Sequence, residues 1–211
     1  REVGQDYLTR LGCEDVFFSL ATHQWMQSFP VDEPRAYAVI VLGGIIAALA
    51  GATQVITKTT HEAEGIPTKE ANAEGVKTTR MAIQLMRLNR LPESPKVAQE
   101  KKIIIQEAHS ILDKTLEMGE GDPVKGALRS IQAGVLDIPW APNRYVAGKV
   151  IPVRDSFGAI RYLEHANLPF GAEILEYHRE KILDRERREG QKIDYQSAIQ
   201  DVTEVSKMLE D

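Results

Sequence analysis

The chain has 211 residues, of which 43% are hydrophobic and 27% are charged, as expected for one large globular domain or a medium-sized domain with an extension. The net charge of -5 gives no electrostatic reason to expect nucleic acid as a partner, because phosphate binding requires a basic surface. The single cysteine, Cys13, excludes an internal disulfide and a cysteine-rich metal cluster, which fits a reducing cytoplasm.

The first half of the chain predicts two strands that alternate with two helices. Residues 16–22 are aromatic and β-branched, which favours a strand. Asp32 and Pro34 are typical of a helix start and Gly51 of a helix end, so we expect a helix over 33–50. Its apolar run is shorter than the ~20 residues that span a membrane, so we expect a buried helix and no membrane contact. Residues 54–58 predict the second strand, and residues 79–91 predict an amphipathic helix.

This alternation implies parallel strands joined by right-handed crossovers. A parallel sheet of two strands is not stable alone, because both faces and both edges need cover. Either the rest of the sheet lies outside this chain, or another chain supplies it. The sequence begins at Arg1, without an initiator methionine or the apolar core of a signal peptide, so we expect it to be cut from the middle of a longer protein.

Beyond residue 91 the sequence predicts mainly helices. Apolar residues recur at helical spacing over 97–118, and further helices are expected over 123–133, 172–189 and 193–208. Residues 134–156 are rich in proline and glycine, which indicates a long ordered loop, and residues 157–163 predict a short strand. Trp140 and Tyr145 in the loop suggest buried packing first and a ligand lid or docking surface second. Residues 185–188, R-E-R-R, are typical of a solvated helix face.

Functional side chains are concentrated in residues 57–75, T-K-T-T-H-E-A-E-G-I-P-T-K-E-A-N-A-E-G, directly after the second predicted strand. Ligand-binding side chains of α/β proteins gather where strands end. Lys58 and Glu62 could grip a sugar diol there, because an ammonium donates to a hydroxyl oxygen and a carboxylate accepts from two hydroxyl groups. The alternative is a surface ion pair worth about 0–1 kcal/mol.

Two other chemistries are open for the same segment. A lysine desolvated by apolar strand residues can lose its proton and form a Schiff base, and Lys58 follows Val55 and Ile56. His23 and His61 could ligate a metal, but the sequence has neither an H-x-x-x-H nor an H-E-x-x-H pattern. We therefore predict no metal site in this chain.

Several motifs follow one another in the order found in one enzyme family. H-E-A-E-G-I-P-T-K-E-A-N at 61–72 is accompanied by T-H-Q-W-M at 22–26, F-P at 29–30, G-V-L-D-I-P at 134–139, A-G-K-V-I-P-V-R-D at 147–155 and R-Y-L-E at 161–164. Across nearly the whole chain, these motifs resemble the large (epsilon) subunit of adenosylcobalamin-dependent glutamate mutase, also called methylaspartate mutase.

The resemblance implies an α/β fold that forms the C-terminal part of a (β/α)8 TIM-type barrel with a mainly helical C-terminal extension. Residues 1–91 would contain the last two βα units and residues 92–211 the extension. The resemblance also implies an isomerase that converts L-glutamate to threo-3-methylaspartate by a radical route. Homolysis of the cobalt–carbon bond of adenosylcobalamin gives a 5'-deoxyadenosyl radical, which takes a hydrogen from the substrate. The implied partners are a small cobalamin-binding (sigma) subunit and a second copy of the large subunit.

The resemblance further assigns individual residues. Lys58 and Glu62 match family positions that hydrogen-bond the adenosyl ribose, and Ile66 and Phe29 match positions that line the cofactor. The cobalt ligand of the family is a histidine in a D-x-H-x-x-G motif on the small subunit, and none of the five histidines here lies in that motif. The arginines that hold the substrate carboxylates lie on earlier barrel strands, so we expect this chain to be inactive alone.

Two alternatives from other functional classes stay open. The chain could be a lyase or aldolase that uses Lys58 as a Schiff base, or a non-catalytic assembly module in which residues 92–211 form a subunit interface.

Overall fold

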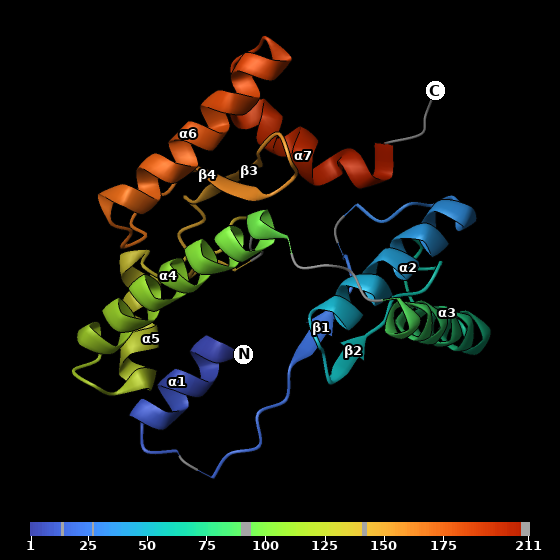
Figure 1. Ribbon diagram of the computed structural model, residues 1–211, viewed down its shortest axis with the longest axis horizontal. Helices are drawn as coiled ribbons and strands as arrows, with labels where there is room; N and C mark the ends of the chain where they lie inside the picture. The colour runs from blue at the N-terminus through green and yellow to red at the C-terminus, as the bar shows by residue number, and fades with distance from the viewer. Residues whose placement is uncertain (14, 27, 90–93, 141–142, 208–211) are drawn as a thin grey trace. The chain divides into compact units, whose positions relative to one another are not determined.

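The chain divides into two units, residues 1–92 together with 202–211, and residues 93–201. A computed structural model describes residues 1–207 except 14, 27, 90–93 and 141–142 (Figure 1). Both units combine helices with short strands, which confirms the mixed α/β class. Within the described residues, each helix is too short or too polar to cross a lipid bilayer.

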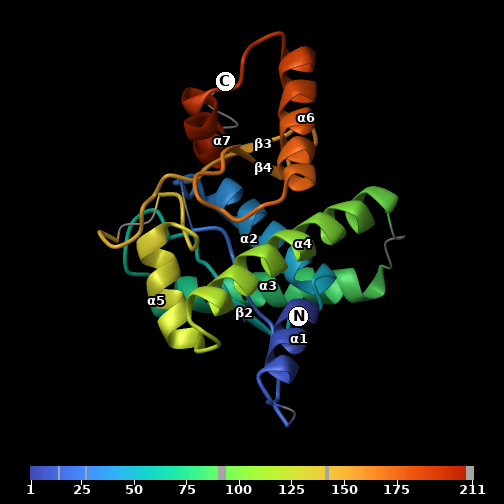
Figure 2. The same ribbon diagram turned by 90° about the vertical axis from the view of Figure 1, so that its left-hand side faces the viewer.

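The first unit contains the predicted order of strand, helix, strand and helix. It consists of β1 (Ala21–His23), α2 (Glu33–Leu49), β2 (Gln54–Ile56) and α3 (Lys69–Leu88), preceded by α1 (Glu2–Arg10), which the sequence did not predict. The two strands pair in parallel, as predicted, with Thr22 opposite Val55. The helices α2 and α3 pack against each other (Figure 1 and Figure 2).

Two predicted elements of this unit have the wrong bounds. Most of the strand predicted over 16–22 is not a strand, because β1 pairs with β2 over three residues only and Phe17 stays 88% exposed. The helix predicted over 79–91 begins earlier, at Lys69, because Thr68 caps it: the hydroxyl of Thr68 accepts from the N–H of Ala71 at 3.1 Å. The last part of segment 57–75 is therefore helical.

Helix α2 begins and ends as predicted but is buried on one face only. Asp32 accepts from the N–H of Arg35 at 3.1 Å, and Gly51 follows the helix with a φ of +64°. The buried face carries Ala36, Ile40, Gly44 and Ala47. The opposite face leaves Leu42, Ile46 and Leu49 more than half exposed. The prediction of a buried helix therefore holds for one face.

The second unit contains the predicted helices and a hairpin that the sequence predicted only in part. The helices are α4 (Pro95–Met118), α5 (Pro123–Ala133), α6 (Ala172–Glu189) and the start of α7 (Tyr195–Lys207). Between α5 and α6, β3 (Ile151–Arg154) pairs antiparallel with β4 (Ile160–Glu164). The prediction of a loop throughout 134–156 is wrong for β3. Pro152 is tolerated there because the register shifts between Ile151 and Pro152.

The turn of this hairpin explains why the predicted strand 157–163 lies slightly too early. The N–H of Gly158 donates to the carbonyl oxygen of Asp155 at 2.9 Å, and Gly158 has a φ of +82°. Residues 155–158 therefore turn the chain, and β4 starts only at Ile160. The hairpin lies beside α6, as Figure 2 shows.

Apolar packing in the second unit tests two further predictions. One cluster contains Val153, Ile182, Ile193 and Ala198, and Trp140 packs against it, whereas Tyr145 is 66% exposed. Packing against the core is thus confirmed for Trp140, which is partly buried, and buried packing is wrong for Tyr145. The solvated face predicted for residues 185–188 is wrong for Arg185, whose guanidinium is buried and donates to Asp201 at 2.8 Å.

Candidate functional site at the ends of the parallel strands

The candidate site lies at the carboxyl ends of β1 and β2. Because the strands are parallel, the residues that follow them meet at one edge of the pair. Gln24 follows β1, and its N–H donates to the carbonyl oxygen of Ile56 at 3.1 Å, while Thr57 and Lys58 follow β2. Ligand-binding side chains of α/β proteins are placed at this edge.

The buried side chain of Gln24, 4% exposed, connects both strand ends to α2 and α3. Its Nε2 donates to the carbonyl oxygen of Ile40 and to the hydroxyl of Thr79, both at 3.0 Å. Its Oε1 accepts from the N–H of Lys58 at 2.8 Å and from the hydroxyl of Thr57 at 3.1 Å. These four contacts fill the hydrogen-bonding capacity of the amide, so the end of β2 is fixed against two helices.

Helix α3 approaches the same strand end at Gly75. A Cβ added to Gly75 would lie 2.4 Å from the carbonyl oxygen of Lys58, so this approach requires a glycine. The hydroxyl of Thr57 lies 2.5 Å from that of Thr79 and 3.3 Å from the carbonyl oxygen of Gly75. We refer to Gln24, Thr57, Gly75 and Thr79 as the strand-end cluster. The cluster restrains the backbone of Lys58 at both its N–H and its carbonyl group.

Lys58 and Glu62 form an ion pair that is largely withdrawn from water. The Nζ of Lys58 lies 2.5 Å from Oε1 of Glu62, and the two side chains are 13% and 26% exposed. Partial burial strengthens the Coulomb attraction relative to an open surface pair. The contact engages one of the three ammonium donors and one of the two carboxylate oxygens, which leaves hydrogen-bonding capacity for a ligand hydroxyl on each partner.

A tight turn after Lys58 brings Glu62 back to it. The N–H of Glu62 donates to the carbonyl oxygen of Thr59 at 3.2 Å, and the N–H of His61 donates to the hydroxyl of Thr59 at 3.2 Å. Thr59 is 3% exposed, so the turn is anchored from inside. The spacing of four residues therefore produces a contact here through a turn rather than through a regular helix.

The two other predicted cofactor residues lie in very different surroundings. Ile66, in the segment between this turn and α3, is 97% exposed and presents an apolar surface. Phe29 is 7% exposed and packs with Ala36 and Ile40 in the core. The structure thus joins Lys58 to Glu62, leaves Ile66 accessible, and makes Phe29 a core residue.

His23, beside the site, is placed for a hydrogen bond to the backbone. Nδ1 of His23 lies 3.0 Å from the carbonyl oxygen of Gln24. Among the described residues, no three histidine, cysteine or acidic side chains are grouped so that they could hold a metal ion.

The second unit contains its own buried charge network. Arg161 is 3% exposed at its side chain and contacts Asp155 at 2.7 Å and Glu100 at 2.5 Å, and the hydroxyl of Tyr177 donates to Glu100 at 2.7 Å. The hydrogen bond from Arg161 holds the pKa of Glu100 below its usual value of 4.5. Burial raises the pKa of Tyr177 to about 12. Most of the polar atoms in this network are paired with one another, although Nε of Arg161 is buried without a hydrogen-bond partner. We interpret the network as structural.

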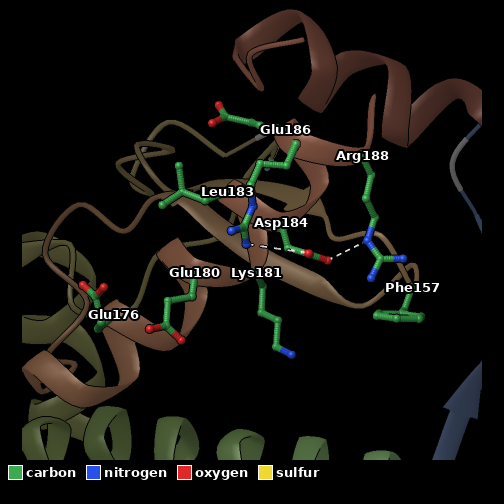
Figure 3. A pocket seen from close by; sticks show the side chains of 9 residues that line it. Phe157, Glu176, Glu180, Lys181, Leu183, Asp184, Glu186 and Arg188 are labelled. Atoms are coloured by element: carbon green, nitrogen blue, oxygen red, sulfur yellow. Dashed lines mark ion pairs between the residues drawn. The ribbon is translucent and has the colours of Figure 1, made fainter. Parts of the chain in front are cut away.

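A hollow of about 720 Å³ lies along α6 and is lined by Phe157, Leu183 and acidic and basic side chains of the helix (Figure 3). Asp184 pairs with Arg188 at 2.9 Å and with Arg187 at 3.7 Å. Because charges of both signs alternate along this helix, the hollow offers no concentrated charge to a ligand. It is typical of a solvated helix surface.

Sequence reasoning identified the ion pair and missed the strand-end cluster that supports it. Gln24 is a polar residue directly after a strand, which makes it a candidate for such a connection. Gly75 offered a signal as well, because a glycine inside a helix is unfavourable unless another segment approaches closely.

Comparisons with known proteins agree on one family. The family described as methylaspartate mutase E chain (MutE) matches residues 1–209. The chain is 48% identical to the glutamate mutase epsilon subunit of Treponema denticola over 98% of its own length and 42% of that protein. It is 48% identical to the glutamate mutase epsilon subunit of Desulfitobacterium hafniense over 96% of the chain and 42% of that protein. The corresponding protein of Escherichia coli O157:H7 is 41% identical over 98% of the chain and 43% of its own length. The chain thus spans about two fifths of the length of these relatives.

Proposed function

The chain belongs to the methylaspartate mutase E chain family, and on this premise we propose that it is the cofactor-facing part of a glutamate mutase large subunit. We propose that the whole protein is an isomerase of the mutase type that depends on cobalamin, and membership of this family supports the proposal. We propose further that the reaction interconverts L-glutamate and threo-3-methylaspartate, that the cofactor is adenosylcobalamin, and that the protein acts in the cytoplasm.

In this proposal, residues 1–91 are the last two βα units of a (β/α)8 barrel and residues 92–211 are its helical extension. The parallel pairing of β1 with β2 supports the barrel. The exposed apolar side chains of α2 at Leu42, Ile46 and Leu49 support it too, because a helix that is apolar on all sides is normally covered. Earlier strands of the full-length protein would supply the cover.

Lys58 and Glu62 carry the proposal, because their arrangement suits a ribose. In the bound state, Lys58 donates to one hydroxyl oxygen and Glu62 accepts from the hydroxyl groups, while the two side chains keep their mutual contact. Each still has the hydrogen-bonding capacity that this requires. Adenosylcobalamin supplies the radical chemistry when bound, and this chain holds the nucleoside in place.

Ile66 and Phe29 have unequal roles in this arrangement. The exposed side chain of Ile66 covers the apolar part of the cofactor. Phe29 reaches the cofactor only through the small part of its ring that is accessible, and mainly supports the wall of the site through its packing on α2.

We propose that the remaining parts of the active site lie on other segments and chains. The substrate carboxylates are held by arginines on earlier barrel strands, so this stretch alone does not catalyse the reaction. A small cobalamin-binding subunit provides the histidine that ligates cobalt. Two large subunits associate as a homodimer.

The structure does not favour the Schiff-base alternative. Formation of a Schiff base requires a neutral amine, whereas the Lys58 ammonium lies 2.5 Å from a carboxylate. Borohydride treatment with candidate carbonyl substrates should therefore leave Lys58 without an adduct.

Cofactor binding by the full-length large subunit with its small partner tests the proposal. Glu62→Gln should weaken the binding of adenosylcobalamin roughly tenfold or more, because a hydrogen bond to a charged group is lost. The binding of methylcobalamin, which has no ribose on cobalt, should not change. Glu64→Gln, an exposed position in the same turn, is the matched control. Equal affinities of wild type and Glu62→Gln for adenosylcobalamin would reject the ribose role.

A further inference from the structure

We propose that Gln24 is the positioning residue of the nucleoside site: it places Lys58 so that the ammonium and Glu62 can bind one diol together. This inference rests on the proposed function of the Lys58–Glu62 pair. Gln24 itself does not contact the nucleoside in this proposal. It acts through the backbone of Lys58.

The hydrogen bonds of Gln24 are directed at the backbone that carries the ion pair. Its Oε1 accepts from the N–H of Lys58 at 2.8 Å, the first residue after the strand that could bind a ligand. The same oxygen accepts from the hydroxyl of Thr57 at 3.1 Å. A displacement of this oxygen would therefore move the Cα of Lys58 and with it the side chain that carries the ammonium.

The opposite end of the amide is held by rigid elements. Nε2 donates to the carbonyl oxygen of Ile40 in α2 and to the hydroxyl of Thr79 in α3, both at 3.0 Å. Gly43 leaves room for the side chain, because a Cβ at that position would lie 2.6 Å from Cγ of Gln24. The amide is thus held between two packed helices and cannot be exchanged for water without loss of several bonds.

The burial of Gln24 distinguishes positioning from ordinary surface support. The residue is 4% exposed, and its amide has both donors and both acceptor positions occupied. Such a fully bonded buried amide specifies one arrangement of its neighbours. The carbonyl side of Lys58 is restrained separately by Gly75, so the backbone of Lys58 is held from both directions.

The role of Gln24 can be measured as selectivity for the adenosyl group. The assay compares the affinities of the full-length large subunit, with its small partner, for adenosylcobalamin and methylcobalamin. Gln24→Met keeps the side-chain volume and removes all four hydrogen bonds, so it should lower the preference for adenosylcobalamin about tenfold. Ile40→Val loosens the same core without removing a hydrogen bond and should keep the preference.

A double-mutant cycle separates positioning from general destabilisation. If Gln24 acts through the ion pair, Gln24→Met should have little further effect on adenosylcobalamin affinity once Glu62 is replaced by glutamine. If the losses of adenosylcobalamin affinity in the two single variants add up in the double variant, the inference is overturned. An unchanged preference in Gln24→Met would overturn it as well. If Glu62→Gln itself has no effect, the proposed function fails instead, so the two failures are distinguishable.

A second variant keeps the test valid if Gln24→Met does not fold. Thr79→Val keeps the side-chain shape but removes the hydroxyl that accepts from Nε2 of Gln24, so the amide loses one of its two anchors on the helices. It should lower the preference for adenosylcobalamin by roughly threefold or more. An unchanged preference in Thr79→Val would overturn the positioning role.

Discussion

The substitution Gly75→Ala has two opposing effects on the stability of the protein. Gly75 lies inside α3, where alanine favours the helix over glycine by about 1 kcal/mol. Helix propensity alone therefore predicts that the variant is more stable than the wild type. The close approach of the β2 end predicts the reverse.

The structure allows the opposing term to be estimated. The new Cβ would lie 2.4 Å from the carbonyl oxygen of Lys58. This distance is roughly 1 Å inside ordinary van der Waals contact. Overpacking of this kind costs about 1–3 kcal/mol. The carbonyl group of Lys58 cannot move aside freely, because the N–H of the same residue donates to Gln24. After subtraction of the propensity gain, we expect a net loss of about 0–2 kcal/mol in the free energy of unfolding.

The assay is denaturant unfolding of the full-length large subunit, with cofactor affinity measured in parallel. Ala73→Gly is the reciprocal control, because Ala73 is exposed in the same helix and reports propensity without a clash. It should lose about 1 kcal/mol and leave adenosylcobalamin affinity unchanged. Gly75→Ala should lower both stability and the preference for adenosylcobalamin over methylcobalamin. If Gly75→Ala instead gains about 1 kcal/mol, the amount that Ala73→Gly is expected to lose, α3 does not approach Lys58 closely.

Three further predictions concern the second unit. Arg161→Met should cost about 3–5 kcal/mol in denaturant unfolding, because it leaves the partly exposed Glu100 and the buried Asp155 without their cation. Arg188→Met, at a 56% exposed side chain, should cost less than about 1 kcal/mol. Arg161 lowers the pKa of Glu100, so the stabilisation from this pair is complete above pH 4.5 and is lost as the pH falls below that value through the folded-state pKa. The thermal unfolding temperatures of wild type and Glu100→Gln should therefore converge at low pH. Asp137→Ala removes the carboxylate that accepts from the backbone N–H groups of residues 148–150 and should cost about 1–3 kcal/mol in the free energy of unfolding. Limited proteolysis should cut the variant faster than the wild type in this segment, and equal cleavage rates would contradict the prediction.

The elements that could be predicted from the sequence are those with local signals. The helices α2, α5 and α6 have capping or terminating residues at their ends, and the structure places them within a residue or two of the prediction. The strands were harder, because their bounds depend on a partner. β1 is short because only three of its residues find one, and β3 was hidden by the proline and glycine that surround it.

The candidate site divides in the same way. Lys58 and Glu62 lie four residues apart, so a single turn brings them together and the sequence alone suggests the pair. Gln24 meets its partners 16, 34 and 55 residues away along the chain, and no local pattern indicates those contacts. Long-range hydrogen bonds of a buried amide become visible only when the strands and helices are in place.

This division has a consequence for how substitutions in the site should be interpreted. A side chain that binds a ligand directly can be recognised from its chemistry, and its loss removes one interaction. Gln24 and Gly75 make no use of ligand chemistry, yet together they restrain the N–H and the carbonyl group of the residue that does. A shift of about 1 Å at that backbone is enough to separate an ammonium from a hydroxyl that it must reach, so the supporting residues should be as sensitive to substitution as the ion pair itself.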